Sequence, residues 1–167
     1  MKRLSPPLLV AVLAFAPAAA LASGPAAPQA LAAPVFDPEL AARTGADAHG
    51  MRAYVLVVLR TGPTPVAAGA ARDAMFAGHF ANMERLAEAG LLVLAGPFQA
   101  DPQGWRGLFV LAVDDIARAR EIVATDPVIS SGEMVADYHA WYGSAATMLL
   151  PGLHRSLVPP PSPASPD

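Results

Sequence analysis

The chain contains no cysteine, so disulfide bonds, thiol catalysis, cysteine-ligated metals and a lipidated N-terminal cysteine are excluded. It also lacks an HExxH zinc motif, a glycine-rich phosphate loop and a GxSxG nucleophile elbow. Its only lysine is Lys2, and no basic cluster with interleaved aromatic residues offers a surface for nucleic acid. We therefore predict no nucleic-acid partner, no cofactor and no metal site, and a fold held together by packing.

Charge and hydropathy divide the first residues into the three parts of a secretory signal peptide. Lys2 and Arg3 give a positive start, an apolar run follows over residues 8–20, and Ala20-Leu21-Ala22 fits the small-x-small cleavage rule. An uncleaved anchor is the alternative, but the run is short for a membrane span. We predict a signal peptide over residues 1–22, no membrane span after its cleavage, and a periplasmic or secreted protein.

Proline content separates a folded middle from two irregular ends. Residues 23–50 are rich in Ala and Pro without a sustained period, and we expect a linker there. Residues 147–167 are rich in Pro and Ser, and we expect a tail, because proline removes backbone donors from helices and strand ladders. The folded domain is expected over residues 51–146, and the sequence shows no internal repeat.

The folded span alternates between strand-like and helix-like segments. The predicted elements are, in order, a strand over 52–60, a helix over 72–89, strands over 91–96 and 107–113, a helix over 115–125 and a strand over 133–142. Gly90 is expected to end the first helix, Asp114 to cap the second, and residues 101–104 to form a turn. The order βαββαβ predicts an α+β fold of the ferredoxin-like type.

The predicted strands are apolar on both faces. In the first strand Val55 and Val57 point to one face, and Tyr54 and Leu56 point to the other. A half-solvated antiparallel sheet would alternate with polar residues instead. Because two helices cover only one face of four strands, we predict a homodimer that covers the other apolar face, sheet against sheet. A chain that sediments as a monomer at micromolar concentration would contradict this.

The helix predicted over residues 72–89 carries a histidine inside its apolar stripe. At about 100° per residue, Phe76, Phe80 and Met83 share this stripe with His79. One interpretation is a core histidine that bonds to the backbone through one ring nitrogen. The other is a general acid or base in a pocket between helix and sheet, which histidine's ionisation near neutral pH would suit.

Asp126 is a candidate partner for this histidine. It follows the second predicted helix, where the helix dipole disfavours an anion, so its carboxylate gains from a nearby cation or proton donor. Both helices pack on the same face in this topology, which allows contact between His79 and Asp126. The alternative is a turn built by Asp126 and Pro127.

The last predicted strand carries a second histidine. Asp137, His139 and Trp141 share one face by the period of two, so His139 and Trp141 either line a ligand cleft or fill an interface. A metal held by His79, His139 and one carboxylate is a further alternative, but no pair of ligands at helical spacing favours it.

Several short motifs together resemble the YciI-like (YCII-related) domain family, and its exported members in particular. The resemblance covers about residues 52–143 and rests on a combined pattern: His79, Gly96-Pro97, Gly107, Asp126-Pro127 and Gly132. It implies a dimeric ferredoxin-like α-β barrel. Most members have no assigned reaction; one relative is a dehydrochlorinase that acts on a chlorinated hydroxyquinol, and the fold is shared with muconolactone isomerase-type proteins.

The resemblance also implies a site built on a His–Asp pair, and those positions fall on His79 and Asp126. Four residues are assigned to substrate binding: Gly96, Pro97, His139 and Trp141. Two positions depart from the family pattern. Family members often carry an arginine one helical turn before the histidine, and Phe76 stands at that position here. Close relatives carry His-Pro-Trp near the end of the domain, whereas this chain has His139-Ala140-Trp141.

Two hypotheses of function remain open. In the first, an exported lyase or isomerase transfers a proton on a small organic acid, with His79 moving the proton and Asp126 orienting it. In the second, the protein is a non-catalytic dimeric module of the cell envelope that binds a small ligand or assembles with another protein. A purely structural His–Asp contact is the third possibility.

Overall fold

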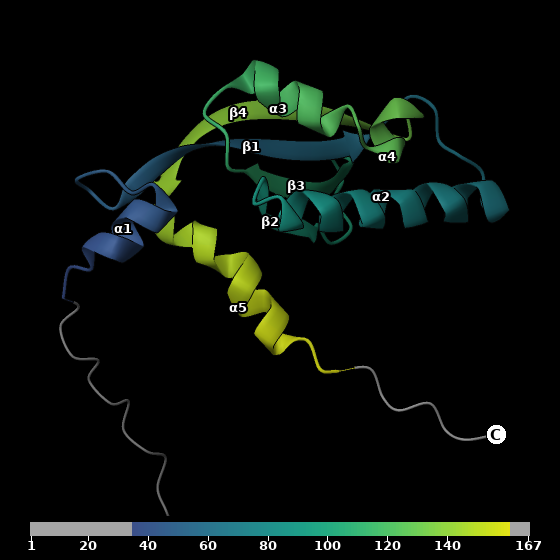
Figure 1. Cartoon of the computed structure of the whole chain (residues 1–167). Helices are drawn as coiled ribbons and strands as arrows, with labels where there is room; N and C mark the ends of the chain where they lie inside the picture. Colours follow the sequence, from purple (N-terminus) through teal and green to yellow (C-terminus); the bar gives the residue numbers. More distant parts are fainter. Residues whose placement is uncertain (1–34, 161–167) are drawn as a thin grey trace, which may run out of the picture. The chain divides into compact units, whose positions relative to one another are not determined.

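The structure, a computed structural model, describes residues 35–160 (Figure 1). The predicted signal peptide over residues 1–22 lies outside this range, as do parts of the predicted linker and tail. The elements, in order, are α1 (Pro38–Thr44), β1 (Met51–Thr61), α2 (Ala70–Glu88), β2 (Leu92–Pro97), β3 (Trp105–Leu111), α3 (Ile116–Val123), α4 (Pro127–Ser130), β4 (Met134–Ser144), the 3-10 helix η1 (Ala145–Leu149) and α5 (Leu150–Leu157). None of these helices is long and apolar enough to cross a membrane.

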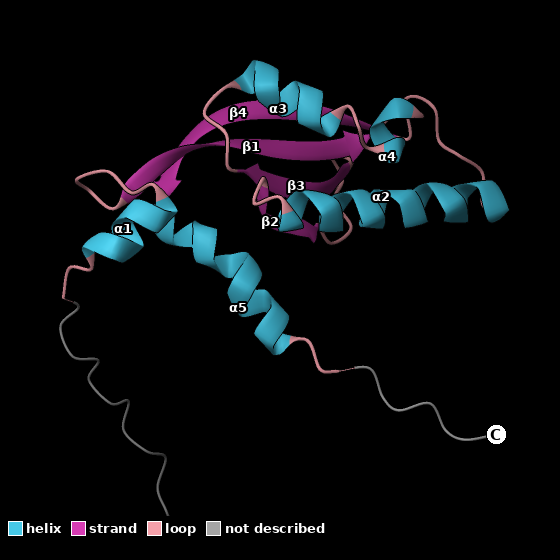
Figure 2. Cartoon of the chain, in the orientation of Figure 1, coloured by secondary structure: helices cyan, strands magenta, loops and turns pink. Residues whose placement is uncertain are grey.

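The four strands form one antiparallel sheet in the order β2-β3-β1-β4. β1 pairs with β4 from Met51 opposite Ser144 to Thr61 opposite Met134, and with β3 on its other side. α2 connects β1 to β2, and α3 with the short α4 connects β3 to β4 (Figure 2). The predicted ferredoxin-like α+β fold is therefore confirmed.

α2 and α3 cover the same face of the sheet, which we call the helix-covered face (Figure 1). Its core joins residues from both helices and the central strands: Val55, Val57, Leu59, Leu86, Phe109, Leu111, Ile122 and Val123. Burial of each such side chain stabilises the fold by about 1.5–3 kcal/mol. This packing, rather than helix propensity, fixes α2 and α3 on the sheet.

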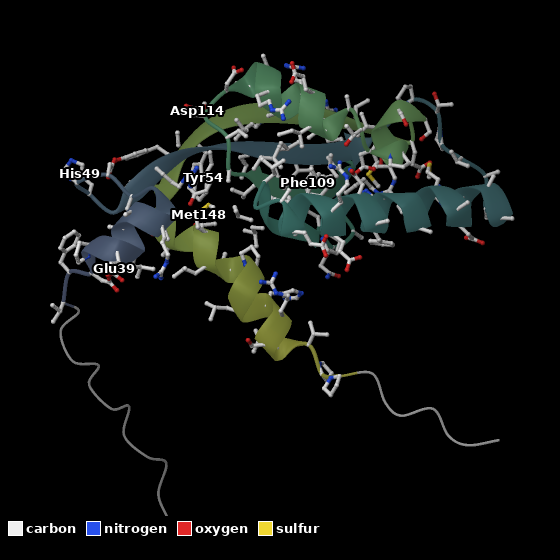
Figure 3. All side chains as sticks on the ribbon, in the orientation of Figure 1. Glu39, His49, Tyr54, Phe109, Asp114 and Met148 are labelled. Carbon is white, nitrogen blue, oxygen red and sulfur yellow. The ribbon has the colours of Figure 1, made fainter. Side chains whose placement is uncertain are left out.

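The opposite face, which we call the open face, carries a smaller cluster of Tyr54, Val93 and Val110. Met148 of η1 packs against this cluster, and Figure 3 shows it close to Tyr54. The chain's own C-terminal segment thus covers part of the face that we expected a second copy to cover. Leu94, which pairs with Val110, is still 41% exposed.

Two helices lie in segments that we predicted to be an irregular linker and tail. Asp37 caps α1 through its side chain, and Pro38 stands in the first turn. Pro151 stands in the first turn of α5. Proline is tolerated there because the first N–H groups of a helix have no intrahelical partner. The expectation that proline excludes helix from these segments is therefore wrong for α1 and α5.

The predicted turns and caps agree with the structure except at one residue. Gly90 follows α2 with φ of 69°, the left-handed conformation that suits a helix terminus. The Gly104 N–H donates to the Asp101 carbonyl at 3.1 Å, which closes the turn between β2 and β3. Asp115, not Asp114, caps α3, because the Asp115 carboxylate accepts from the first N–H groups of that helix.

Candidate functional site

α2 buries a stripe that differs slightly from the predicted one. Its buried residues are His79, Asn82 and Leu86, whereas Phe80 is 62% exposed. The prediction for Phe80 is wrong because the side of α2 that meets α4 and the sheet centres on His79 and Asn82. Phe80 instead lies at the border of a cavity beside His79.

Gly78 allows α2 and α4 to approach each other. A Cβ atom at this position would lie 3.0 Å from the Cγ atom of Pro127, at the edge of steric overlap. Glycine inside a helix costs roughly 0.5–1 kcal/mol relative to alanine, so its presence here fits a packing requirement. The close approach sets His79, the next residue along α2, beside Asp126, the residue before Pro127.

His79 and Asp126 form a buried pair. His79 Nδ1 lies 2.8 Å from Oδ2 and 2.9 Å from Oδ1 of Asp126, and the two residues are 7% and 1% exposed. An ionised carboxylate only accepts hydrogen bonds, so the matching tautomer has its proton on Nδ1 and donates a hydrogen bond to Asp126. Nε2 on the other side of the ring is then free to accept a proton.

Asp126 is fixed by more than the histidine. Its carboxylate accepts from the Val128 N–H at 3.1 Å, which caps α4, and from Asn82 Nδ2 at 3.4 Å. The Arg85 guanidinium in turn donates to Asn82 Oδ1 at 2.6 Å. The turn and the histidine pair, which the sequence left as alternatives, are therefore two functions of one carboxylate. Sequence reasoning missed Asn82, which stands three residues after His79 on the same face of α2.

A cavity of about 310 Å³ opens beside His79 on the helix-covered face. Its lining residues are Leu59, Phe76, His79, Phe80, Met83, Gly96, Pro97, Phe98, Arg106, Gly107, Phe109 and Met134. The imidazole stacks on Phe109, with ring centroids 6.1 Å apart and planes 20° apart, and meets Phe76 edge-on. Figure 3 shows Phe109 on the side of the sheet that faces α2.

The ring of His79 is not sealed in the core. Within residues 35–160 Nε2 has no hydrogen-bond partner, yet no buried side-chain nitrogen or oxygen atom there lacks one. Nε2 is therefore not fully buried, and His79 is one of the residues that line the cavity. This geometry disfavours the interpretation of His79 as a purely internal core histidine.

A second buried carboxylate belongs to Glu133, which no sequence motif marks. It is 2% exposed, and it accepts from the Val66 N–H and from Arg72 Nη1, each at 2.7 Å. Arg106 Nη1 lies 3.6 Å from the same carboxylate. Burial alone would raise the pKa of Glu133, but the Val66 N–H and the two guanidinium groups outweigh burial and lower it. An acid next to a strand end is ordinarily exposed, so the sequence carried no signal for this cluster.

His139 and Trp141 lie on the open face, away from His79. Trp141 pairs with Tyr54 across the sheet, with ring centroids 5.4 Å apart, and His139 is exposed. Neither residue lines the cavity, whereas Gly96 and Pro97 do. The structure thus brings Gly96 and Pro97 together with His79 and separates His139 and Trp141 from it.

The same separation disfavours a metal shared by His79 and His139, because the sheet lies between them. In the part of the chain that the structure describes, no three His, Asp or Glu side chains are grouped to hold a metal ion.

Comparisons with known proteins concern the segment that contains this site. A family model described as the YCII-related domain matches residues 53–141, just over half of the chain. No curated protein matches the chain. Among solved structures, 5-chloro-2-hydroxyhydroquinone dehydrochlorinase (TftG) from Burkholderia phenoliruptrix AC1100, in complex with 2,5-dihydroxybenzoquinone, is similar with a TM-score of 0.40 and 18% identity. That match covers 53% of this chain and 92% of the other. The family match includes both His79 and Asp126.

Proposed function

The chain belongs to the YCII-related domain family, and from this premise we propose that it is an exported enzyme of the lyase or isomerase type. In this proposal the His79–Asp126 pair transfers a proton on a small organic acid. The orientation of the imidazole carries the proposal, since Nδ1 is held by a buried carboxylate and Nε2 is accessible beside a cavity. A base, its orienting partner and a space for substrate are the parts that such a reaction needs.

The chemistry follows from the two ring nitrogens. Nε2 accepts a proton from a C–H or O–H group of the bound substrate, and the imidazole becomes a cation. Asp126, 2.8 Å from Nδ1, stabilises that cation and keeps the ring in place. An isomerase then returns the proton to a different atom, whereas a lyase lets a leaving group depart with the electron pair. The apolar walls keep water from competing for the proton.

We also propose that the protein is a homodimer that packs through the uncovered part of the open face. Leu94 and Trp141 on this face are 41% and 39% exposed, although η1 covers the neighbouring Tyr54. Exposed apolar groups next to an apolar cluster favour association. The dimer is also the form in which the alternative function, a non-catalytic binding or assembly module, would operate.

Proton transfer can be tested without knowledge of the natural substrate. We would follow deuterium incorporation from solvent by NMR for a panel of small unsaturated acids, lactones and chlorinated hydroxyhydroquinones. His79→Gln should lower the exchange rate at least about a hundredfold, the usual scale for a missing acid–base group. His139→Gln, the matched control on the open face, should stay within about threefold because it does not reach the cavity.

Two outcomes would contradict the proposal. If His79→Gln loses less than about threefold in rate, the imidazole does not transfer the proton. If the natural chain exchanges no proton on any compound while His79→Gln changes only melting temperature or ligand affinity, the non-catalytic module is the better description.

A further inference from the structure

The cavity beside His79 contains a second polar side chain. Apart from His79, Arg106 is the only polar side chain among its lining residues, and the rest are aliphatic, aromatic or glycine. The volume of about 310 Å³ is at the small end of the range for ligand pockets. In a mostly apolar pocket, the few polar groups determine which ligand binds and in which orientation.

The guanidinium of Arg106 is not saturated by its neighbours. Its Nη1 lies 3.6 Å from Glu133, beyond a good hydrogen bond, while Arg72 occupies the same Glu133 oxygen at 2.7 Å. Within residues 35–160 the Arg106 side chain donates no hydrogen bond, and it is 31% exposed. Arg106 therefore has donors that no residue of the described chain occupies, and it is one of the lining residues of the cavity.

The charges around Arg106 do not balance. Two guanidinium groups, those of Arg72 and Arg106, face the single buried carboxylate of Glu133, which leaves a net positive charge at this wall. Arg72 Nη1 donates to Glu133 at 2.7 Å and to the Val66 carbonyl at 2.9 Å, and the Arg72 guanidinium lies over the ring of Phe76, whereas Arg106 makes no such hydrogen bond to Glu133. The surplus charge is therefore carried by Arg106.

We infer that Arg106 is the residue that recognises the acid group of the ligand, and that the cavity takes a planar aromatic or unsaturated carboxylate. A guanidinium binds a carboxylate through two parallel hydrogen bonds, which fixes orientation as well as charge. Phe76 and Phe98 supply aromatic walls for the rest of the ligand. Glu133 holds Arg106 near the wall without using its donors. This inference rests on the proposed function for the role of His79, but it concerns binding alone.

Calorimetric titration of the purified protein with benzoate and with benzamide tests it. Benzamide has nearly the same shape but no charge. Benzoate should bind the natural chain at least about tenfold more tightly than benzamide, and added salt should weaken benzoate binding alone. Arg106→Gln should remove about tenfold of the benzoate affinity and abolish the preference, while Arg106→Lys should keep part of it.

The matched control is Arg118→Gln. Arg118 lies on α3, pairs with Glu121 and does not line the cavity, so its loss should leave both affinities within about twofold. Melting curves of all variants check that the fold is retained. Equal binding of benzoate and benzamide to the natural chain, no binding of benzoate, or unchanged benzoate binding by a folded Arg106→Gln variant would each overturn the inference.

The two proposals fail separately. If benzoate binding depends on Arg106 but the chain exchanges no proton, the inference about Arg106 holds and the proposed enzymatic function is wrong. If proton exchange depends on His79 but Arg106→Gln does not affect it, the proposed function holds and the inference about Arg106 is wrong.

Discussion

The two faces of the sheet carry similar residues in different surroundings. Each has a histidine and an aspartate, but His79 and Asp126 are buried and bonded to each other, whereas His139 is exposed and Asp137 pairs with Arg60. Charge interactions are several times stronger away from water, so only the first pair is held in a setting where a proton can be directed. The contrast shows that position relative to the helices, rather than residue type, makes the candidate site.

The largest difference in stability between the two faces is expected when Asp126 and Asp137 are each replaced by alanine. Asp126→Ala should destabilise the protein by about 3 kcal/mol, because it leaves the His79 Nδ1 proton and the Val128 N–H without partners in a buried place. Asp137→Ala should change stability little, because its partner Arg60 is partly exposed and can bind water. Chemical denaturation of the two variants measures the difference.

A double-mutant cycle between His79→Gln and Asp126→Ala tests whether the loss of stability arises from the contact between the two side chains. The cycle should give a coupling energy of about 1–3 kcal/mol if the two groups act together. Additive effects, or equal losses at Asp126 and Asp137, would mean that the two faces do not differ as described.

The second prediction concerns the exposed apolar residues of the two faces. Leu94→Glu should weaken the proposed dimer at least about thirtyfold, or about 2 kcal/mol, because it places a charge in the proposed interface. Phe80→Glu should leave association unchanged, although Phe80 is 62% exposed, because it lies on the helix-covered face beside the cavity. Sedimentation equilibrium compares the variants. If the natural chain is a monomer at micromolar concentration, the proposed homodimer is wrong.

Much of this architecture could be predicted because its signals are local. Strand composition, the turn at residues 101–104 and the terminator Gly90 each depend on a few neighbouring residues, and together they imply the fold. The contact between His79 and Asp126 could be anticipated once the topology put both helices on one face. The short helices α1 and α5 could not be predicted from composition, because a proline is compatible with a helix only in its first turn, and composition does not show where a helix begins.

What could not be predicted depends on long-range approach. Arg72 and Glu133 are 61 positions apart in the sequence, and Arg106 comes from a third element, so no local pattern joins them. The position of Glu133 also depends on Gly62, where a Cβ atom would overlap the Gly132 carbonyl. Such a close backbone contact leaves no mark in the hydrophobic periodicity.

Lowering the pH should also change the stability contributed by carboxylates on the two faces, with a smaller effect than the substitutions above. The pKa of Glu133 is lowered from its ordinary value of 4.5, so its ionised form stabilises the fold fully above that pH. This stability should be lost as pH falls below 4.5 and through the lower folded-state pKa, because protonation removes the charge that the Val66 N–H and the two guanidinium groups stabilise. Glu133→Gln should flatten this part of the stability curve.

The control for acidification is Asp137→Asn. The hydrogen bond from Arg60 lowers the pKa of Asp137 as well, but the pair lies at the surface, so added salt should weaken its contribution and leave that of Glu133 largely unchanged. Denaturation curves at low and high salt, recorded from about pH 6 to about pH 3, measure the free energy of unfolding that each carboxylate contributes. If salt screens both carboxylates equally, Glu133 is not buried as described.

The smallest difference is expected between two glycines inside helices. Gly152 of α5 has open space where a Cβ atom would stand, so Gly152→Ala should stabilise the helix by up to about 1 kcal/mol through propensity alone. Gly78→Ala should gain nothing, because its Cβ would lie 3.0 Å from Pro127 and push α4 away from α2. Thermal melts compare the two variants. Equal stabilisation would show that α2 and α4 have room to spare, and that the approach of His79 to Asp126 does not depend on a missing side chain.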